Sequence, residues 1–187
     1  CTAFTIESCG EYYPGSTSFG RTVAYGEPSE ELRLVYTRVV QAYVSMASAL
    51  IPVGATMGQL EALALQPLLQ TLEELGAQEA GHADVLLGVS RSAALREGMC
   101  FAINPRVSVQ EGSHVSVKNL VVVEAAPGSK GRLLRFRPLT LVPLQRGLLD
   151  RSLLARKELD FIDAYHRTIW EELSPHIEGQ RAAAAAA

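Results

Sequence analysis

The sequence predicts an α+β fold, in which strands and helices come in separate blocks along the chain. Three segments show apolar residues with a helical period, and the stretches before and between them are rich in β-branched residues bounded by Gly and Pro. Elements that follow one another in blocks are typical of α+β proteins. The length of 187 residues and the hydrophobic share of 48% fit one domain with a substantial core.

The N-terminal block predicts strands. Residues 2–7, 11–13 and 17–24 have the alternating or β-branched pattern of three short strands. Pro14-Gly15 is a turn signal that separates the second strand from the third. We therefore expect two short strands and a turn before the third strand.

Two helices are expected next. Ser29 is a suitable N-cap, and apolar positions with helical spacing predict a helix that ends near Leu50. Thr56 and Gln59 form a capping box, in which side chain and backbone satisfy each other's free groups. A second helix should therefore span residues 57–75.

The C-terminal half predicts further strands and a last helix, whereas residues 77–97 show no clean period. The expected strands lie at residues 99–103, 106–109, 114–124 and 132–137. Residues 120–123 read L-V-V-V, which predicts burial on both faces of a sheet. A final helix is expected over residues 156–173, ended by Ser174-Pro175.

Composition excludes several classes of function. The net charge of −3 and the absence of long basic runs give no electrostatic case for a nucleic-acid binder. No window of about 18 apolar residues predicts a membrane span. Cys1, Cys9 and Cys100 have no metal-type spacing, and an odd cysteine count fits a reducing compartment. We expect an intracellular protein, and the residues do not distinguish cytoplasm from mitochondrion.

The two ends of the chain have unusual compositions. The sequence starts as a strand without an initiator Met, so we expect a longer N-terminal part. The last six residues are alanines, either a helical extension or placeholder residues. The predicted organisation is one domain over residues 1–178 and a tail over residues 179–187.

Three segments carry distinctive motifs. Residues 136–144 read F-R-P-L-T-L-V-P-L, residues 158–166 read E-L-D-F-I-D-A-Y-H, and residues 20–29 read G-R-T-V-A-Y-G-E-P-S. All three resemble segments of aminopeptidase P, the X-Pro aminopeptidases of metallopeptidase family M24. Residues 136–144 resemble its F-E-P-L-T-L-V-P-I segment, and residues 158–166 resemble its helix with N-x-Y-H. Residues 20–29 resemble its T-R-T-x-x-x-G-x-P-T segment. The resemblance covers nearly all of residues 4–175.

This resemblance implies a pita-bread fold, here mostly its second half, in which helices back a curved antiparallel sheet. Active members of the family remove an N-terminal residue that precedes proline. They use two metal ions, usually manganese, that generate a hydroxide and polarise the carbonyl under attack. Such a centre takes hard oxygen ligands from Asp and Glu together with a His.

The resemblance places Glu7 and Ser18 at the first two metal-ligand positions. The family has an Asp in I-D-S-G, where residues 6–9 read I-E-S-C. It has a second Asp in G-T-T-D, where residues 15–18 read G-S-T-S. The neutral hydroxyl of Ser18 cannot replace a bridging carboxylate, so a two-metal centre is not expected.

His82 and Arg91 occupy the histidine positions. Residues 78–83 read Q-E-A-G-H-A and can be laid on the family's H-G-T-G-H-G, which makes His82 the one ligand retained. Nine positions further, Arg91 stands where the family has a proton-handling His. The resemblance therefore implies loss of the proton-handling group.

Asn104 and Lys118 stand at the positions of the last two ligands, glutamates in E-P-G-Y and R-I-E-N. The family's spacing of fourteen positions is kept between them. Lys118 puts a cation where a metal dication would sit, and such charges a few ångströms apart repel by several kcal/mol, on the order of 4 or more. We interpret retained spacing with inverted charge as a preserved fold and an abandoned reaction.

Three states of these remnants are open. Glu7 and His82 could hold a single metal ion, although metal sites normally need three or four ligands. Lys118 could instead pair with Glu7 across the former cavity, which is the interpretation that we favour. Alternatively, Lys118 is simply solvated.

The remaining candidates have ordinary interpretations. His114, His166 and His176 are expected to be hydrogen-bonded or exposed rather than metal ligands. Ser8 and Ser18 lack a recognisable His–Asp partner for a serine hydrolase. The basic cluster is expected to be an exposed strand edge rather than a phosphate or RNA contact. Its members are Lys130, Arg132, Arg135 and Arg137.

The sequence therefore predicts a pseudoenzyme without a metal cofactor. We expect a structural or interaction subunit that binds protein partners in a larger assembly, or forms a homodimer or a dimer with a paralogue. An active or residual X-Pro aminopeptidase and a non-cleaving peptide-binding module remain alternatives. Metal analysis and peptide hydrolysis separate them.

Overall fold

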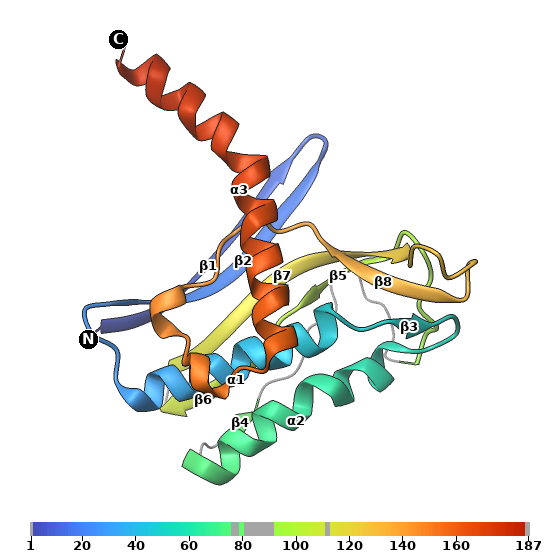
Figure 1. Cartoon of the computed structure of the whole chain (residues 1–187), viewed down its shortest axis with the longest axis horizontal. Coiled ribbons are helices and arrows are strands. Elements are labelled where there is room, and N and C mark those ends of the chain that lie inside the picture. Colours follow the sequence, from blue (N-terminus) through green and yellow to red (C-terminus); the bar gives the residue numbers. More distant parts are fainter. Residues whose placement is uncertain (1, 76–78, 81–91, 111–112, 186–187) are drawn as a thin grey trace.

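A computed structural model describes residues 2–75, 79–80, 92–110 and 113–185 of the chain (Figure 1). The expectations for Cys1, His82 and Arg91 lie outside the described residues. Within them, strands and helices form the predicted α+β arrangement, with one large antiparallel sheet and helices packed against it.

The sheet contains eight strands in the described part of the chain. They are β1 (Thr2–Tyr12), β2 (Gly15–Tyr25), β3 (Ile51–Pro52), β4 (Glu79–Ala80), β5 (Cys100–Ile103), β6 (Arg106–Gln110), β7 (Ser113–Ala125) and β8 (Leu133–Pro138). β7 is the central strand and pairs with β2, β5, β6 and β8, always antiparallel. β1 pairs with β2 along its whole length and ends the sheet on that side.

Three α-helices accompany the sheet: α1 (Glu30–Ala47), α2 (Met57–Leu75) and α3 (Arg156–Ala185). Two 3-10 turns, η1 (Arg146–Leu148) and η2 (Arg151–Leu153), lead from the sheet into α3. α1 and α2 lie side by side, and the C-terminal end of α3 projects from the body of the protein on the same side as the tip of the β1–β2 hairpin (Figure 1). α1 is buried on most of its surface, because it packs against β7, α2 and α3.

The two faces of the sheet differ, because successive strand residues point to opposite sides. We call the face that carries Arg21 and Asn119 the helix face, since both side chains are buried against Tyr165 of α3. The other face carries Glu7, Gly20 and Lys118, and we call it the second face.

One sequence expectation about the strands was wrong, and a second is only partly met. β1 is a single strand of 11 residues rather than two short ones, because the ladder with β2 continues through Cys9 and Gly10. Burial of residues 120–123 on both faces is only partly found: Val121 and Val123 are fully buried, whereas Leu120 and Val122 are half-buried. The helix face of β7 is therefore the better-packed one.

The two expected helix ends also differ. α1 ends at Ala47 rather than near Leu50, because the chain turns there into β3, where Ile51 pairs with Leu134 of β8. α3 continues through Pro175 to Ala185. Pro175 has no N–H for the carbonyl of Glu171, so the helix continues there with one hydrogen bond fewer. The alanines that follow favour helix more than any other residue.

In the part of the chain that the structure describes, no helix is both long enough and apolar enough to cross a bilayer. α1 and α3 carry charged residues on their exposed sides.

Candidate functional site

Three strands bring Glu7, Gly20 and Lys118 into one row on the second face. Glu7 pairs with Gly20 in the β1–β2 ladder, and Gly20 pairs with Lys118 in the β2–β7 ladder. β5 and β6 keep a common register against β7, which places Asn104, between the two strands, opposite Lys118. We call this set, Glu7, Gly20, Lys118 and Asn104, the site row.

Gly20 lets its neighbours in the site row approach closely. A Cβ atom at position 20 would lie 3.0 Å from Lys118 Cβ and 3.7 Å from Glu7 Cγ. The side chains of Glu7 and Lys118 therefore flank the space above the glycine from its two sides. A larger residue at position 20 would crowd Lys118 Cβ, which would have to shift by a few tenths of an ångström.

Ser18 lies beside the site row, on the same face and two residues before Gly20 along β2. It pairs with Cys9 of β1, and Cys9 Sγ lies 3.4 Å from Ser18 Oγ. Both atoms are neutral, and Cys9 is a free, exposed cysteine. This corner of the site therefore presents a hydroxyl and a thiol rather than a carboxylate.

The expected ion pair between Glu7 and Lys118 is not formed in the structure. Glu7 Oε1 lies instead 3.9 Å from Nε2 of His114, and no carboxylate of the described residues comes within ion-pair distance of Lys118. At the site row β2 lies between β1 and β7, about 10 Å between their strand axes, so the charged heads of Glu7 and Lys118 meet only by bending over Gly20. Lys118 is half-buried and Glu7 is exposed.

His114 is a neighbour of Glu7 that the sequence analysis missed. It lies four positions before Lys118 on β7, so both side chains point to the second face. Its backbone oxygen accepts a hydrogen bond from Thr5 Oγ1 at 2.8 Å, which ties this end of β7 to β1. The alternation of β7 is the sequence signal that could have found it.

Beneath the site row, the buried guanidinium of Arg21 holds the helix face together. Arg21 is only 2% exposed. It donates to six oxygen acceptors at 2.5–3.2 Å: the carbonyls of Gly20, Lys118, Val142 and Pro143, Asn119 Oδ1 and the Tyr165 hydroxyl. A buried cation without such acceptors would be strongly unfavourable. Two of these acceptors are the carbonyls of site-row residues, so Arg21 fixes their backbone.

Tyr165 extends this network into α3. Its hydroxyl lies 3.0 Å from the carbonyl oxygen of Thr140 and 2.8 Å from that of Val142, and it accepts from Asn119 Nδ2 at 3.2 Å. Burial raises the pKa of Tyr165 above its ordinary value. The phenol therefore stays protonated and fixes residues 140–143 against the sheet.

His166, the next residue of α3, anchors the same segment. Its Nε2 accepts a hydrogen bond from the backbone N–H of Leu144 at 3.0 Å, which requires a neutral ring. Burial and then the nearby Arg146 lower the pKa of His166. The expectation of a hydrogen-bonded rather than metal-binding role is therefore supported for this histidine.

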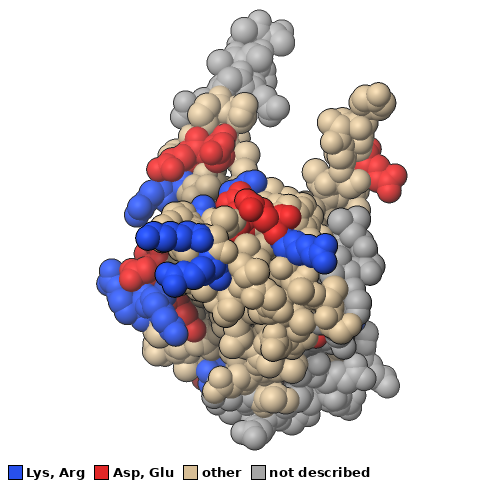
Figure 2. All heavy atoms as spheres, turned by 90° about the vertical axis from the view of Figure 1, so that its right-hand side faces the viewer, with Lys and Arg blue, Asp and Glu red and all other residues tan. Residues whose placement is uncertain are grey.

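The basic cluster lies on the β7–β8 hairpin. Arg135 and Arg137 are exposed, and both contact Glu124 on the neighbouring strand. The hydrogen bond from Arg137 is the first cause of the lowered pKa of Glu124. Lys and Arg side chains on this side of the molecule are mixed with Asp and Glu (Figure 2). The arrangement agrees with a charged strand edge rather than a continuous basic surface.

The donor set of the site row does not fit a two-metal centre. Such a centre needs several carboxylates, but Glu7 is the one carboxylate in the row, and Lys118 brings a positive charge to it. Among the described residues, no three of the metal-binding types His, Cys, Asp and Glu gather closely enough to hold an ion. The geometry of these residues is that of a sheet surface with one acid and one base.

Comparison with known proteins identifies the family of this chain. The profile of metallopeptidase family M24 matches residues 2–125, and that of the C-terminal region of peptidase M24 matches residues 132–186. The chain belongs to metallopeptidase family M24. The resemblance read from the motifs is thereby confirmed.

Curated relatives of this M24 chain are X-Pro aminopeptidases. It is 29% identical to aminopeptidase P2 of Arabidopsis thaliana and 29% identical to Xaa-Pro aminopeptidase app-1 of Caenorhabditis elegans. Both alignments cover 94% of this chain but only 27% and 31% of the respective relative. The chain thus spans about a third of the length of the relatives that it matches.

Solved structures show the same fold. X-prolyl aminopeptidase from Caenorhabditis elegans, described as a cytosolic enzyme with a di-nuclear active site, superposes with a TM-score of 0.79 at 25% identity. That match covers 95% of this chain and 31% of the other. Escherichia coli aminopeptidase P matches with a TM-score of 0.56 over 90% of this chain and 42% of the other, at 14% identity. The predicted pita-bread architecture is confirmed.

The structure thus brings together four of the six positions that the motifs singled out. Glu7, Lys118 and Asn104 share the site row, and Ser18 lies beside it. Their role as former metal-ligand positions, with His82 as a retained ligand and Arg91 at the proton-handling position, stays a prediction from the resemblance.

Proposed function

We propose that this M24 chain is catalytically inactive and serves as a structural or interaction subunit of a larger protein assembly. Its partner in that assembly is another protein, a second copy of the chain or a paralogue. We also propose that the protein lies inside the cell, as does the cytosolic relative from Caenorhabditis elegans. We further propose that it works without a metal cofactor.

The observation that supports this proposal is the position of Lys118 in the site row. Its side chain flanks Gly20 from the side opposite Glu7, in the middle of the row. A metal dication about 4 Å from an ammonium group would be repelled by several kcal/mol at an effective dielectric constant near 20. Neighbouring neutral groups on Ser18 and Asn104 offer no compensating negative charge.

The interaction role is supported by the surface of β1 and β2. Phe4 and Ile6 of β1 are each 41% exposed, and Tyr25 of β2 is 70% exposed and stacks on Phe4. Apolar side chains that gather on a surface in this way usually mark a contact with another protein segment. β1 also ends the sheet, so one side of its backbone is free to pair within the described structure.

Metal analysis and a peptidase assay test the loss of catalysis. We expect no stoichiometric manganese after equilibration with Mn²⁺ and no hydrolysis of an X-Pro peptide, with the Caenorhabditis elegans relative as positive control. The names of the curated relatives favour the alternative, a residual X-Pro aminopeptidase. Hydrolysis of the X-Pro peptide that a chelator abolishes would establish that alternative and refute the proposal.

Sedimentation of the natively extracted protein tests the assembly role. We expect a complex of defined stoichiometry that dissociates in the double variant Phe4→Asp, Tyr25→Ser. Tyr13→Ser is the matched control, because Tyr13 is fully exposed at the hairpin tip, away from the Phe4–Tyr25 stack. A monomer in every preparation would refute a subunit role.

A further inference from the structure

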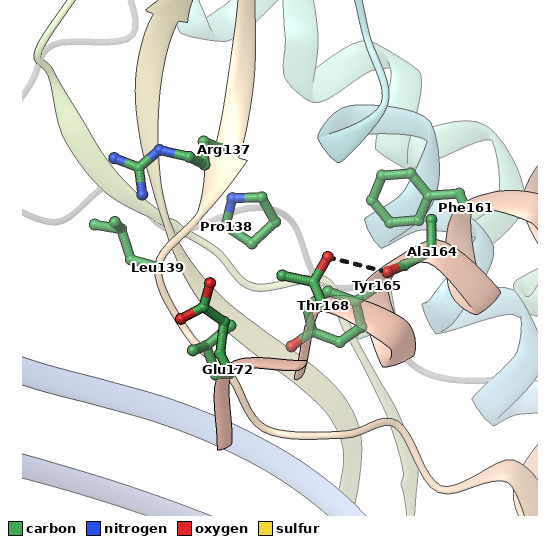
Figure 3. A pocket seen from close by; sticks show the side chains of 9 residues that line it. Arg137, Pro138, Leu139, Phe161, Ala164, Tyr165, Thr168 and Glu172 are labelled. Carbon is green, nitrogen blue, oxygen red and sulfur yellow. Dashed lines mark hydrogen bonds between the residues drawn. The ribbon is translucent and has the colours of Figure 1, made fainter. Parts of the chain in front are cut away.

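A cavity lies between the end of β8 and α3, away from the site row. It has a volume of about 510 Å³ (Figure 3). Most of its wall is apolar, formed by Pro138, Leu139, Leu141, Phe161, Ala164 and Tyr165. We call it the β8–α3 pocket. Its size falls within the range of small-molecule sites, and apolar walls are usual in such sites.

The walls of the β8–α3 pocket are fixed before any ligand arrives. The rings of Phe161 and Tyr165 both pack edge-on against Tyr43 of α1, with centroids 6.1 and 6.3 Å apart. The hydroxyl of Tyr165 is held by the Arg21 and Asn119 hydrogen bonds on the helix face. A preformed pocket spares a ligand the cost of ordering its site.

The mouth of the pocket carries one charge of each sign. Arg137 comes from β8 and Glu172 from α3, and Leu139 lies between their charged heads in the view of Figure 3. Arg137 uses its Nε to bond Glu124, while its two terminal nitrogens make no hydrogen bond to the described residues. Within the same part of the chain, Glu172 has no hydrogen-bond or ion-pair partner. Both groups are therefore available to a ligand.

The charge of Arg137 is not cancelled by its neighbour. Arg135 and Arg137 share the single carboxylate of Glu124, so one positive charge remains on this strand. A guanidinium with two free N–H-bearing nitrogens matches the two oxygens of a carboxylate. A carboxylate such as that of Glu172 matches an ammonium group in turn.

We propose that the β8–α3 pocket binds a small zwitterion of one or two amino-acid residues with apolar side chains. The apolar part fills the space against Phe161 and Tyr165, the ligand's carboxylate meets Arg137, and its ammonium group meets Glu172. This site is separate from the site row, so it does not depend on whether the chain hydrolyses peptides. A ligand with only a carboxylate would leave Glu172 facing a like charge or an apolar atom. A ligand with only an ammonium group would do the same to Arg137.

Calorimetric titration of the full chain with the dipeptide leucyl-phenylalanine tests the proposal. We expect saturable binding that weakens by about tenfold or more when the N-terminus is acetylated or the C-terminus is amidated. No heat of binding for the free dipeptide would overturn the proposal. Equal affinity for the free, acetylated and amidated forms would overturn the zwitterion assignment.

Variants with matched controls place the ligand. Arg137→Gln and Glu172→Gln should each weaken binding about tenfold or more. Arg132→Gln, just before β8, and Glu171→Gln on α3 lie outside the pocket wall and should leave binding unchanged. Ala164→Trp should abolish binding by filling the cavity, and Ala164 is exposed, so folding is not at stake. Undiminished binding by the Ala164→Trp protein would overturn the location.

Discussion

Lys118 and Glu7 lie on the two sides of Gly20, on two strands that β2 separates at this point. The glycine lies between β1 and β7, and Lys118 Cβ comes within 3.0 Å of the place where a side chain at position 20 would begin. The site row is thus a surface with one acid and one base, in which position 20 leaves little room for a side chain.

Gly20→Ala should destabilise the protein by about 1–3 kcal/mol, because the new methyl group would overpack against Lys118 Cβ. Lys118 Cβ is bonded directly to the backbone, so it can move away only if β7 moves as well. Urea unfolding measures the change. Gly147→Ala is the matched control, since a methyl group there meets no atom within 4 Å. Equal stability of the two variants would contradict the close approach.

Lys118→Glu should raise the affinity for Mn²⁺ by at least about tenfold, because it replaces a repelling charge by an attracting one in the site row. Lys118→Met removes the repulsion without adding a ligand and should lie between the wild type and Lys118→Glu. Electron paramagnetic resonance of free Mn²⁺ measures binding in all three proteins. Identical affinities would show that Lys118 does not control metal binding.

Spacing was sufficient to predict the site row but not its surroundings. Asn104 and Lys118 kept the family spacing, and the alternation of strands then brought Glu7, Lys118 and Asn104 to one face. The favoured Glu7–Lys118 ion pair was wrong: Glu7 lies beside His114 instead, a neighbour that depends on how the strands pair. His114 was expected to be hydrogen-bonded or exposed, and its position beside Glu7 was not inferred, although the same alternation places it on that face.

The network around Arg21 left no sequence signal. Four of its six acceptors are backbone carbonyls, which every residue has, and two of these belong to the distant segment at Val142 and Pro143. The continuation of α3 through Pro175 was missed for a related reason. Proline removes one hydrogen bond and crowds the carbonyl four residues earlier, so it disfavours a helix without ending every one, and α2 likewise continues through Pro67.

Arg21→Lys should destabilise the protein by about 3–5 kcal/mol, because an ammonium group cannot reach the acceptors that the guanidinium spans and leaves several of them buried without a donor. Urea unfolding is the measurement. Arg167→Lys, on the exposed side of α3, is the control and should change stability little. A loss for Arg21→Lys no larger than that of the control would show that the buried network adds nothing to stability.

The neutral ring of His166 should make stability depend on pH. Its pKa is lower in the folded chain than the ordinary value of 6.5, so the unfolded chain binds more protons between the two values. The contribution of neutral His166 to the free energy of unfolding is therefore complete above about pH 6.5. It is lost as the pH falls toward the pKa of His166 in the folded chain. Protonation would put a second donor against the Leu144 N–H and a positive charge beside Arg146, with only Asp163 to offset it. His166→Gln keeps an acceptor for that N–H and should flatten the profile measured by urea unfolding between pH 7.5 and 5.5, whereas His176→Gln, at an exposed position of α3, should leave the wild-type slope. The same slope in both variants would assign the pH dependence to other groups.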